Sequence, residues 1–177
     1  IDLLPGQNVN FSGIEPGLLA AEEGAGIIVL ARNAPAASGG FGMEPNARID
    51  GLTVTGADHA GGVVVNGYAH YLEISNNLIT ANQGFYSGGI RIGHPFLTAE
   101  GPSGLDCDHG HNDNIRIHHN LISGNGGLDG VGGGVSLFTG TDYYEVTDNY
   151  ICGNFTAGGG IRIEYVNGQD VANALGA

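Results

Sequence analysis

Short apolar runs recur along this chain with the same polar residues between them. An Asn-x-Ile-x-x-Asn motif occupies residues 77–82, 120–125 and 149–154. Each copy follows a run in which apolar and polar residues alternate, and a double glycine with a second such run comes after it. Alternation with a period of two predicts half-buried β-strands, and a motif that recurs every few tens of residues indicates stacked repeats. The pattern therefore predicts an all-β fold built from repeated short strands.

The predicted strands are only a few residues long, so we expect each repeat to stack directly on the next. A strand of a few residues cannot bury its apolar face alone, whereas stacking at about 4.8 Å bonds it to its counterparts before and after. Asparagine tolerates the left-handed backbone of a corner, and its amide can bond to the next asparagine in a stack. We therefore expect the motif asparagines to form structural ladders at the corners.

Alignment of the repeats on isoleucine and asparagine predicts three outward columns of side chains. The first alternates in charge, which favours correct register between neighbouring strands; it holds Arg48, Glu73, Arg116 and Glu145. The second holds Thr55, Thr80, Ser123 and Cys152. The third holds Val64, Arg91, Ser136 and Arg162, so two arginines are expected on one outer face, either solvated or contacting acidic groups of a glycan.

The Asn-x-Ile-x-x-Asn units and the Gly-Gly-Ile-x-Ile runs resemble the repeats of right-handed parallel β-helices in the pectate-lyase-like superfamily. The resemblance covers residues 24–166 and implies a single-stranded right-handed parallel β-helix, a solenoid of about 5–7 coils. Insertions at 33–46 and 93–113 interrupt the repeats. We interpret residues 1–23 as an irregular lead-in or N-terminal cap, and 167–177 as a tail or a continuation into further coils.

Charge limits the partners that this chain can bind. Its 177 residues include 18 acids and 5 arginines but no lysine, for a formal net charge of −13. Such a surface repels phosphate backbones and anionic membranes, so nucleic-acid binding and membrane insertion are not expected. No apolar run of about 18 residues predicts a membrane span, and no signal peptide is visible. Cations and polysaccharides remain as partners, and we expect a secreted or cell-surface location.

The second insertion carries the densest group of metal-binding side chains. The candidate metal ligands are Asp106, Asp108, His109, His111 and Asp113. Aspartates with Asn112 would suit calcium, whereas histidines with Cys107 and His94 would suit zinc or copper. Neither set has the spacing of a defined motif, and a polar surface loop explains the same residues.

The two cysteines leave three alternatives. Cys107 and Cys152 could form a disulfide, remain as two free thiols or bind a metal ion. The sequence does not choose among these arrangements.

Candidate contacts to a polysaccharide lie on the outer columns and at the second insertion. These residues are Arg91, His94, Arg116, His118 and Arg162. Asp148 falls in the column of His119, so the two could pair as a base and its orienting group, or only as a structural contact.

The resemblance implies enzymes as well as inert modules. Lyases of this architecture use calcium-binding acids and a basic residue, and hydrolases place several aspartates on adjacent coils. The outer columns here hold no stacked aspartate row, and the chain has no lysine. We therefore expect a non-catalytic extracellular module of a larger protein, a scaffold or adhesin-like element that binds glycan or calcium, with no required cofactor and no assigned catalytic residue.

Two alternative functions stay open. One is a polysaccharide lyase or glycoside hydrolase that acts on an acidic polysaccharide. The other is a filament subunit, because the open ends of stacked strands invite pairing with another copy or with adjoining coils of a longer chain.

Overall fold

A computed structural model describes residues 24–29, 31, 41, 47–93, 111–127, 132–138 and 141–156, and the backbone of two strands after them. Within this part every regular element is a strand, and no helix is long and apolar enough to cross a membrane. The strands up to residue 93 are β1 (Ile27–Val29), β2 (Arg48–Asp50), β3 (Thr53–Thr55), β4 (Val63–Val65), β5 (Glu73–Ser75), β6 (Leu78–Thr80), β7 (Gln83–Gly84) and β8 (Ile90–Ile92). Those that follow are β9 (Arg116–His118), β10 (Leu121–Ser123), β11 (Gly126–Gly127), β12 (Val135–Leu137), β13 (Glu145–Thr147), β14 (Tyr150–Cys152), β15 (Phe155–Thr156), β16 (Glu164–Val166) and β17 (Gln169–Val171).

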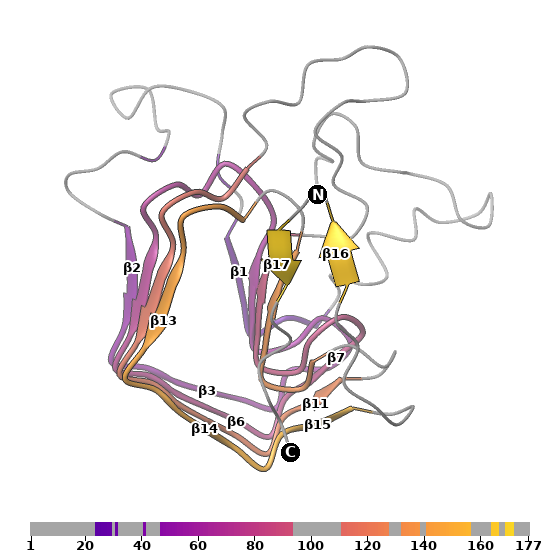
Figure 1. Cartoon of the computed structure of the whole chain (residues 1–177). Helices are drawn as coiled ribbons and strands as arrows, with labels where there is room; N and C mark the ends of the chain where they lie inside the picture. Colours follow the sequence, from indigo (N-terminus) through magenta and orange to yellow (C-terminus); the bar gives the residue numbers. More distant parts are fainter. Residues whose placement is uncertain are drawn as a thin grey trace.

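The strands assemble into parallel sheets that run across the repeats (Figure 1). The three large sheets have the orders β1-β4-β8-β12, β2-β5-β9-β13 and β3-β6-β10-β14, and a short sheet has the order β15-β11-β7. Each repeat thus contributes one strand to each large sheet. The prediction of an all-β fold with parallel, stacked strands is confirmed, and the arrangement is consistent with a solenoid.

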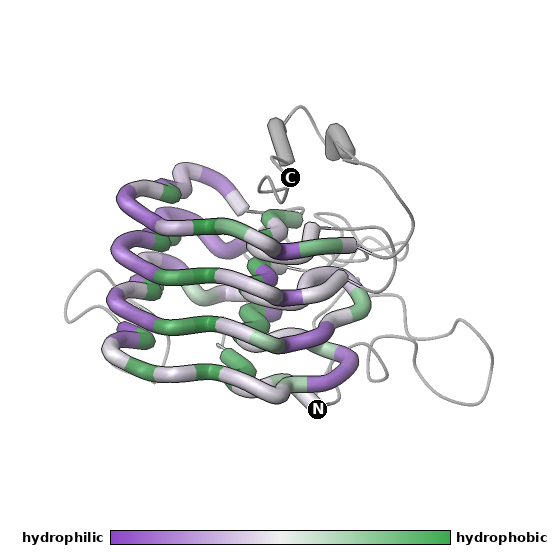
Figure 2. Tube along the Cα trace, turned by 90° about the horizontal axis from the view of Figure 1, so that it is seen from below, coloured by the Kyte–Doolittle hydropathy of each residue, from purple (hydrophilic) through white to green (hydrophobic). Residues whose placement is uncertain are grey.

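The predicted register is confirmed wherever the structure describes it. Arg48 pairs with Glu73, Glu73 with Arg116, and Arg116 with Glu145. The second column pairs in the same way, from Thr55 through Thr80 and Ser123 to Cys152. Figure 2 shows the consequence, with apolar and polar positions of successive turns lying above one another.

The core is a set of apolar columns between the sheets. Ile74, Ile79, Ile117 and Ile122 are fully buried, as are Ile90 and Ile92 in the sheet β1-β4-β8-β12. Burying one such side chain contributes about 1.5–3 kcal/mol. The alternation of the sequence therefore positions the core correctly.

Both predicted asparagine ladders are present. The Asn82 amide donates to Oδ1 of Asn125 at 3.0 Å, and the Asn125 amide donates to Oδ1 of Asn154 at 2.9 Å. Asn77, Asn120 and Asn149 form the second ladder in the same way. Each amide in these ladders also donates to a backbone carbonyl of a neighbouring repeat, for example Asn125 to Ile79 at 2.9 Å.

The expectation that the ladder asparagines themselves adopt a left-handed backbone is wrong. The left-handed backbone belongs to the residue before each ladder position, not to the ladder asparagine itself. Before one ladder these residues are Gly51, Asn76, His119 and Asp148, and before the other they are Gly56, Ala81, Gly124 and Gly153. The ladder asparagines are thus selected for hydrogen bonding, because their amides satisfy backbone groups of two repeats at once.

Arg91 also departs from its predicted place. It pairs in register with Val64 and Ser136, as the third column requires, but its side chain is fully buried. Its guanidinium lies 5.8 Å from the centre of the Tyr86 ring, and Tyr86 packs edge-to-face on Phe138. The outer face of this sheet is therefore covered, and Arg91 is not available to a glycan.

The remaining domain predictions fall mostly outside the described residues. These are the lead-in at 1–23, most of the insertion at 33–46 and residues 94–110 of the second insertion. β16 and β17 form an antiparallel pair that crosses the predicted boundary at residue 166.

Candidate functional site

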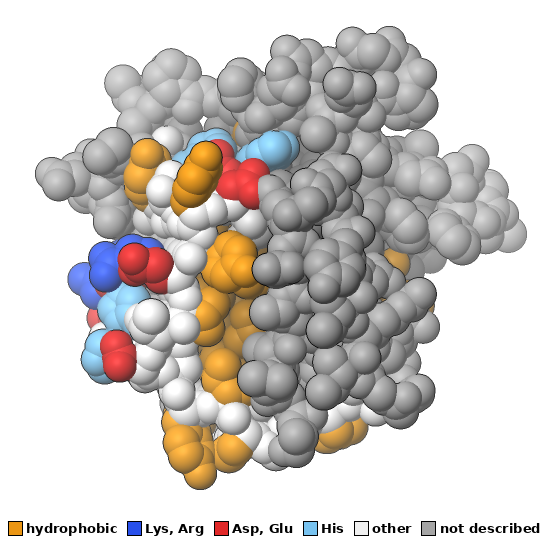
Figure 3. Space-filling view, in the orientation of Figure 1, with side chains coloured by type: hydrophobic (Ala, Val, Ile, Leu, Met, Phe, Trp, Pro, Cys, Tyr) orange, Lys and Arg blue, Asp and Glu red, His pale blue; other side chains and the backbone are white. Residues whose placement is uncertain are grey.

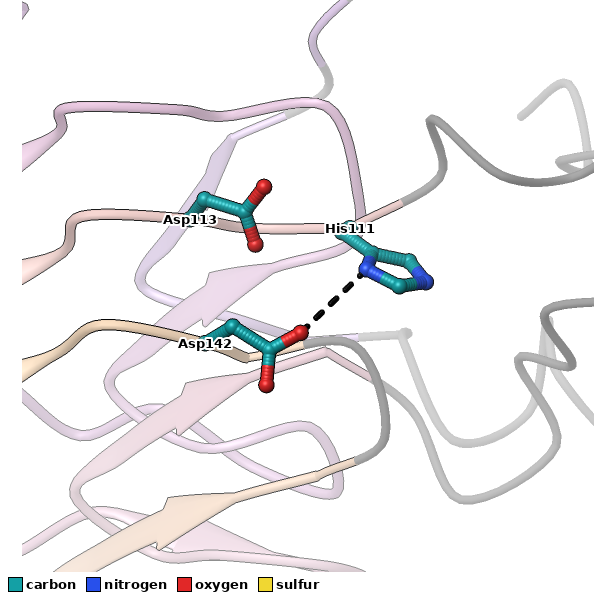
Figure 4. A group of neighbouring side chains, drawn as sticks. All are labelled: His111, Asp113 and Asp142. Atoms are coloured by element: carbon teal, nitrogen blue, oxygen red, sulfur yellow. Dashed lines mark ion pairs between the residues drawn. The ribbon is translucent and has the colours of Figure 1, made fainter. Parts of the chain in front are cut away.

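A column of titratable side chains lies at the corner that precedes β5, β9 and β13. Two backbone bonds set its register: Tyr71 N donates to Asp113 O at 2.8 Å, and Asn114 N donates to Asp142 O at 2.9 Å. The column therefore runs His70, Asp113, Asp142, one residue from each of three repeats. His111 precedes Asp113 by two positions and projects to the same corner (Figure 4).

Left-handed residues next to the column shape this corner. Tyr71, Asn114 and Tyr143 have φ values of 60°, 59° and 55°. Asn112 is fully buried, and its Oδ1 accepts the backbone N–H of Ala69 at 3.2 Å. Backbone hydrogen bonds and the buried amide of Asn112 thus hold the bends, so the backbone that carries the neighbouring side chains is fixed in position.

His111, Asp113 and Asp142 bring their ligand atoms close together. One such atom from each lies within 4.8 Å of the other two. His111 Nδ1 is 3.4 Å from Asp142 Oδ2, and His70 Nδ1 is 3.6 Å from Asp113 Oδ2. About a quarter of each side chain is exposed, so the group is shielded but reachable from solvent.

The surroundings of Asp113 disfavour its charged form. Burial raises the pKa of Asp113 above its ordinary value, and nearby Asp142 adds to the rise while His70 and His111 oppose it. Asp113 Oδ1 and His111 Nε2 are buried, and neither has a hydrogen-bond partner among the described residues. Figure 4 shows Nε2 on the side of the His111 ring that faces away from Asp142.

A second polar group covers the outer face of β2, β5 and β9. Glu73 Oε1 accepts a hydrogen bond from Arg48 at 3.1 Å and lies 2.7 Å from His118 Nε2. His118 Nδ1 lies 2.9 Å from Nδ1 of His119. If Nε2 donates to Glu73, neutral His118 accepts from His119, which is exposed and keeps Nε2 free as an acceptor.

The same face continues on either side of this chain of contacts. Arg116 Nε donates to Glu145 at 3.3 Å, and both side chains are more than half exposed. A hydrogen bond from the Ser75 hydroxyl, followed by one from the Asn76 amide, holds the pKa of Asp50 below its ordinary value. Basic, acidic and histidine side chains are visible together along one edge of the molecule in Figure 3.

The predicted site residues are thus distributed over several places. Two of the predicted metal ligands, His111 and Asp113, lie close together. Arg116 and His118, predicted to contact polysaccharide, lie on the outer face of β9. Cys152 is a free, half-buried thiol. The other predicted residues lie outside the described residues and remain predictions: His94, Asp106, Cys107, Asp108, His109 and Arg162.

Sequence reasoning missed His70 and Asp142. Extending the column alignment three residues before Glu73, Arg116 and Glu145 would have found both, because register alone places them beside Asp113. His111 joins them through the bend of the chain, which the alignment does not contain.

No protein-family model, curated protein or solved structure matches this chain with significance.

Proposed function

We propose that this chain is a right-handed parallel β-helix of the pectate-lyase-like type that serves as a non-catalytic scaffold and binds polysaccharide on the outer face of β2, β5, β9 and β13. The observation that carries the proposal is the polar row on this face. Arg48, Glu73, Arg116 and Glu145 follow one another in register across four repeats.

A row of this kind suits a polymer. Strand spacing sets a repeat of about 4.8 Å from one polar side chain to the next. A linear polysaccharide laid across the strands would meet the exposed side chains of Arg48, Arg116 and Glu145. Glu73 is buried in the row, where it contacts Arg48 and His118. Because each arginine already has a carboxylate neighbour, the face favours sugar hydroxyls over isolated acidic groups.

Binding to immobilised neutral and uronic-acid polysaccharides, measured by calorimetry or a glycan array, tests the proposal. We expect the double variant Arg116→Ala/His118→Ala to lose binding. The matched control is Thr80→Ala/Ser123→Ala, which alters the neighbouring sheet at the second column and should bind normally. Equal binding by both variants, or no binding by the unaltered chain, would contradict the proposal.

An enzyme is the second candidate, and one contact favours it. The 2.7 Å contact between Glu73 and His118 is the geometry of a carboxylate that orients an imidazole base. Release of unsaturated products or reducing ends from uronic-acid polymers, abolished by Glu73→Gln, would establish catalysis and replace the scaffold proposal.

A further inference from the structure

We propose that His111, Asp113 and Asp142 bind one divalent transition-metal ion of the zinc class. The site shares no residue with the outer face of β2, β5, β9 and β13 that we propose binds polysaccharide. It lies at the corner that precedes β5, β9 and β13. It would join the repeat that contains β9 to the repeat that contains β13.

The geometry is close to that of a formed site. A tetrahedral zinc ion with bonds of about 2.0–2.2 Å places neighbouring ligand atoms roughly 3.4 Å apart. His111 Nδ1 and Asp142 Oδ2 are already 3.4 Å apart. The three ligand atoms lie within 4.8 Å of one another, about 1.4 Å more than the tetrahedral spacing, so the group has only a short distance to close around an ion.

The donor set selects the class of metal. Calcium takes six to eight oxygen ligands, whereas this group offers two carboxylates and an imidazole among the described residues. Imidazole with carboxylate suits zinc, copper, iron or nickel. Three protein ligands also leave a position open for water or another ligand.

The charges of this group favour a bound cation. Asp113 and Asp142 are in register on adjacent repeats, and like charges placed in this way destabilise a sheet. Asp113 Oδ1 is buried without a hydrogen-bond partner among the described residues. A bound cation would neutralise the two carboxylates, and the formal net charge of −13 favours its approach.

His70 completes the surroundings of the site. Its Nδ1 accepts the backbone N–H of Asp113 at 3.3 Å, which fixes the backbone from which that carboxylate projects. We therefore assign His70 a positioning role and leave it outside the ligand set.

Metal content and affinity of the untagged chain test the proposal. After removal of metals with a chelator, we expect one equivalent of zinc to bind at about pH 7.5, where neutral imidazole is available. Cobalt(II) should bind in the same place with the strong visible absorption of a four-coordinate site. Calcium should not compete. Asp142→Asn should weaken zinc binding by at least about 10-fold and remove the cobalt spectrum.

Matched controls separate the site from other metal-binding groups. His119 and Asp148 occupy equivalent neighbouring positions at another corner, so His119→Ala/Asp148→Asn should bind zinc normally. Asp142→Asn also removes a like-charge contact, so the metal-free variant should unfold at the same denaturant concentration as the parent or higher. Unchanged binding by Asp142→Asn would overturn the proposal. Tighter binding of calcium than of zinc, or loss of binding only in Asp106→Asn/His109→Gln, would do so as well.

Discussion

Single residues in this protein are selected mainly by the backbone positions that they occupy. The bend before the ladder of Asn82, Asn125 and Asn154 needs a left-handed residue in every repeat, and glycine fills it at Gly56, Gly124 and Gly153. Ala81 stands in the same position with φ of 54°. A side chain with a Cβ costs about 1–2 kcal/mol in this conformation, so one repeat carries strain that the others lack.

Ala81→Gly should therefore stabilise the protein by about 0.5–1 kcal/mol, because relief of strain exceeds the added entropy of the unfolded chain. Gly153→Ala is the matched reverse change, since its new Cβ would meet no atom within 4 Å and only the backbone strain remains. It should cost about 1 kcal/mol. Urea unfolding of both variants checks the pair, and a loss of stability in Ala81→Gly would contradict the assignment.

Asp50 gives the protein a pH-dependent contribution. Its folded pKa lies below the ordinary value of 3.8, chiefly because the Ser75 hydroxyl donates to the carboxylate. The stabilisation is therefore present above about pH 3.8 and is lost as the pH falls through the lowered folded pKa. Asp50→Asn should be less stable than the parent at about pH 7, and the difference should shrink in acid. Urea unfolding across this range measures it; a difference that grows in acid would refute the sign.

At the scale of elements, the ladders and the glycine columns hold neighbouring repeats together. Asn125 is fully buried and accepts the backbone N–H of Asn82 at 3.1 Å, in addition to its bonds with other ladder groups. Gly89 lies in the stack of double glycines and packs against Gly134 and Ile122 of the next repeat. A Cβ at Gly89 would lie 2.2 Å from the carbonyl oxygen of Gly134. Neighbouring strands are thus held together by the hydrogen bonds of the asparagine ladder. At the glycine stack they approach closely because no side chain separates them.

Asn125→Ala should cost about 3 kcal/mol or more, since several buried groups lose their partner at about 1–3 kcal/mol each. Asn76→Gly is the control, because that exposed asparagine already has a left-handed backbone and loses only its hydrogen bond to Asp50, which should cost no more than about 1 kcal/mol. Chemical unfolding of both chains measures the difference, and similar losses would show that burial in the ladder is not what matters.

Gly89→Ala should cost about 3 kcal/mol, near the upper end of the usual overpacking penalty, because the obstacle is backbone that cannot rotate away. The comparison with Gly153→Ala separates this clash from backbone strain. Equal unfolding midpoints for the two variants would mean that the repeats can slide apart without cost.

At the scale of the whole molecule, charge is the dominant feature. The formal net charge is −13, and the ion pairs on the outer face use all of the described exposed arginines. Self-repulsion of this size opposes compact folding, and salt screens it. The same field concentrates cations near the protein, which assists the proposed metal site.

Raising sodium chloride from about 0.01 M to about 0.15 M, which shortens the Debye length from about 30 Å to about 8 Å, should raise the thermal unfolding temperature. Screening of the repulsion should outweigh the weakening of exposed ion pairs, which contribute only about 0–1 kcal/mol each. Potassium chloride should act equally if screening is the cause. A fall in the unfolding temperature would show that the outer ion pairs dominate.

The sequence by itself determined the strands, their register and the two asparagine ladders. These features follow from local periodicity and from a repeat that can be aligned with itself, so Ile74, Ile117 and Val146 fall in one column without any knowledge of the fold. The alternating charges of Arg48, Glu73 and Arg116 are readable for the same reason.

Only the tertiary structure decided which outward side chains are buried and which titratable side chains lie close together at a corner. Arg91 follows the alternation of an outward residue, yet it is fully buried, with its guanidinium 5.8 Å from the centre of the Tyr86 ring. His111 Nδ1 lies 3.4 Å from Asp142 Oδ2, although the residue in register with Asp142 is Asp113. Periodicity describes each strand against its neighbours, whereas burial and side-chain convergence depend on the path of the chain between strands.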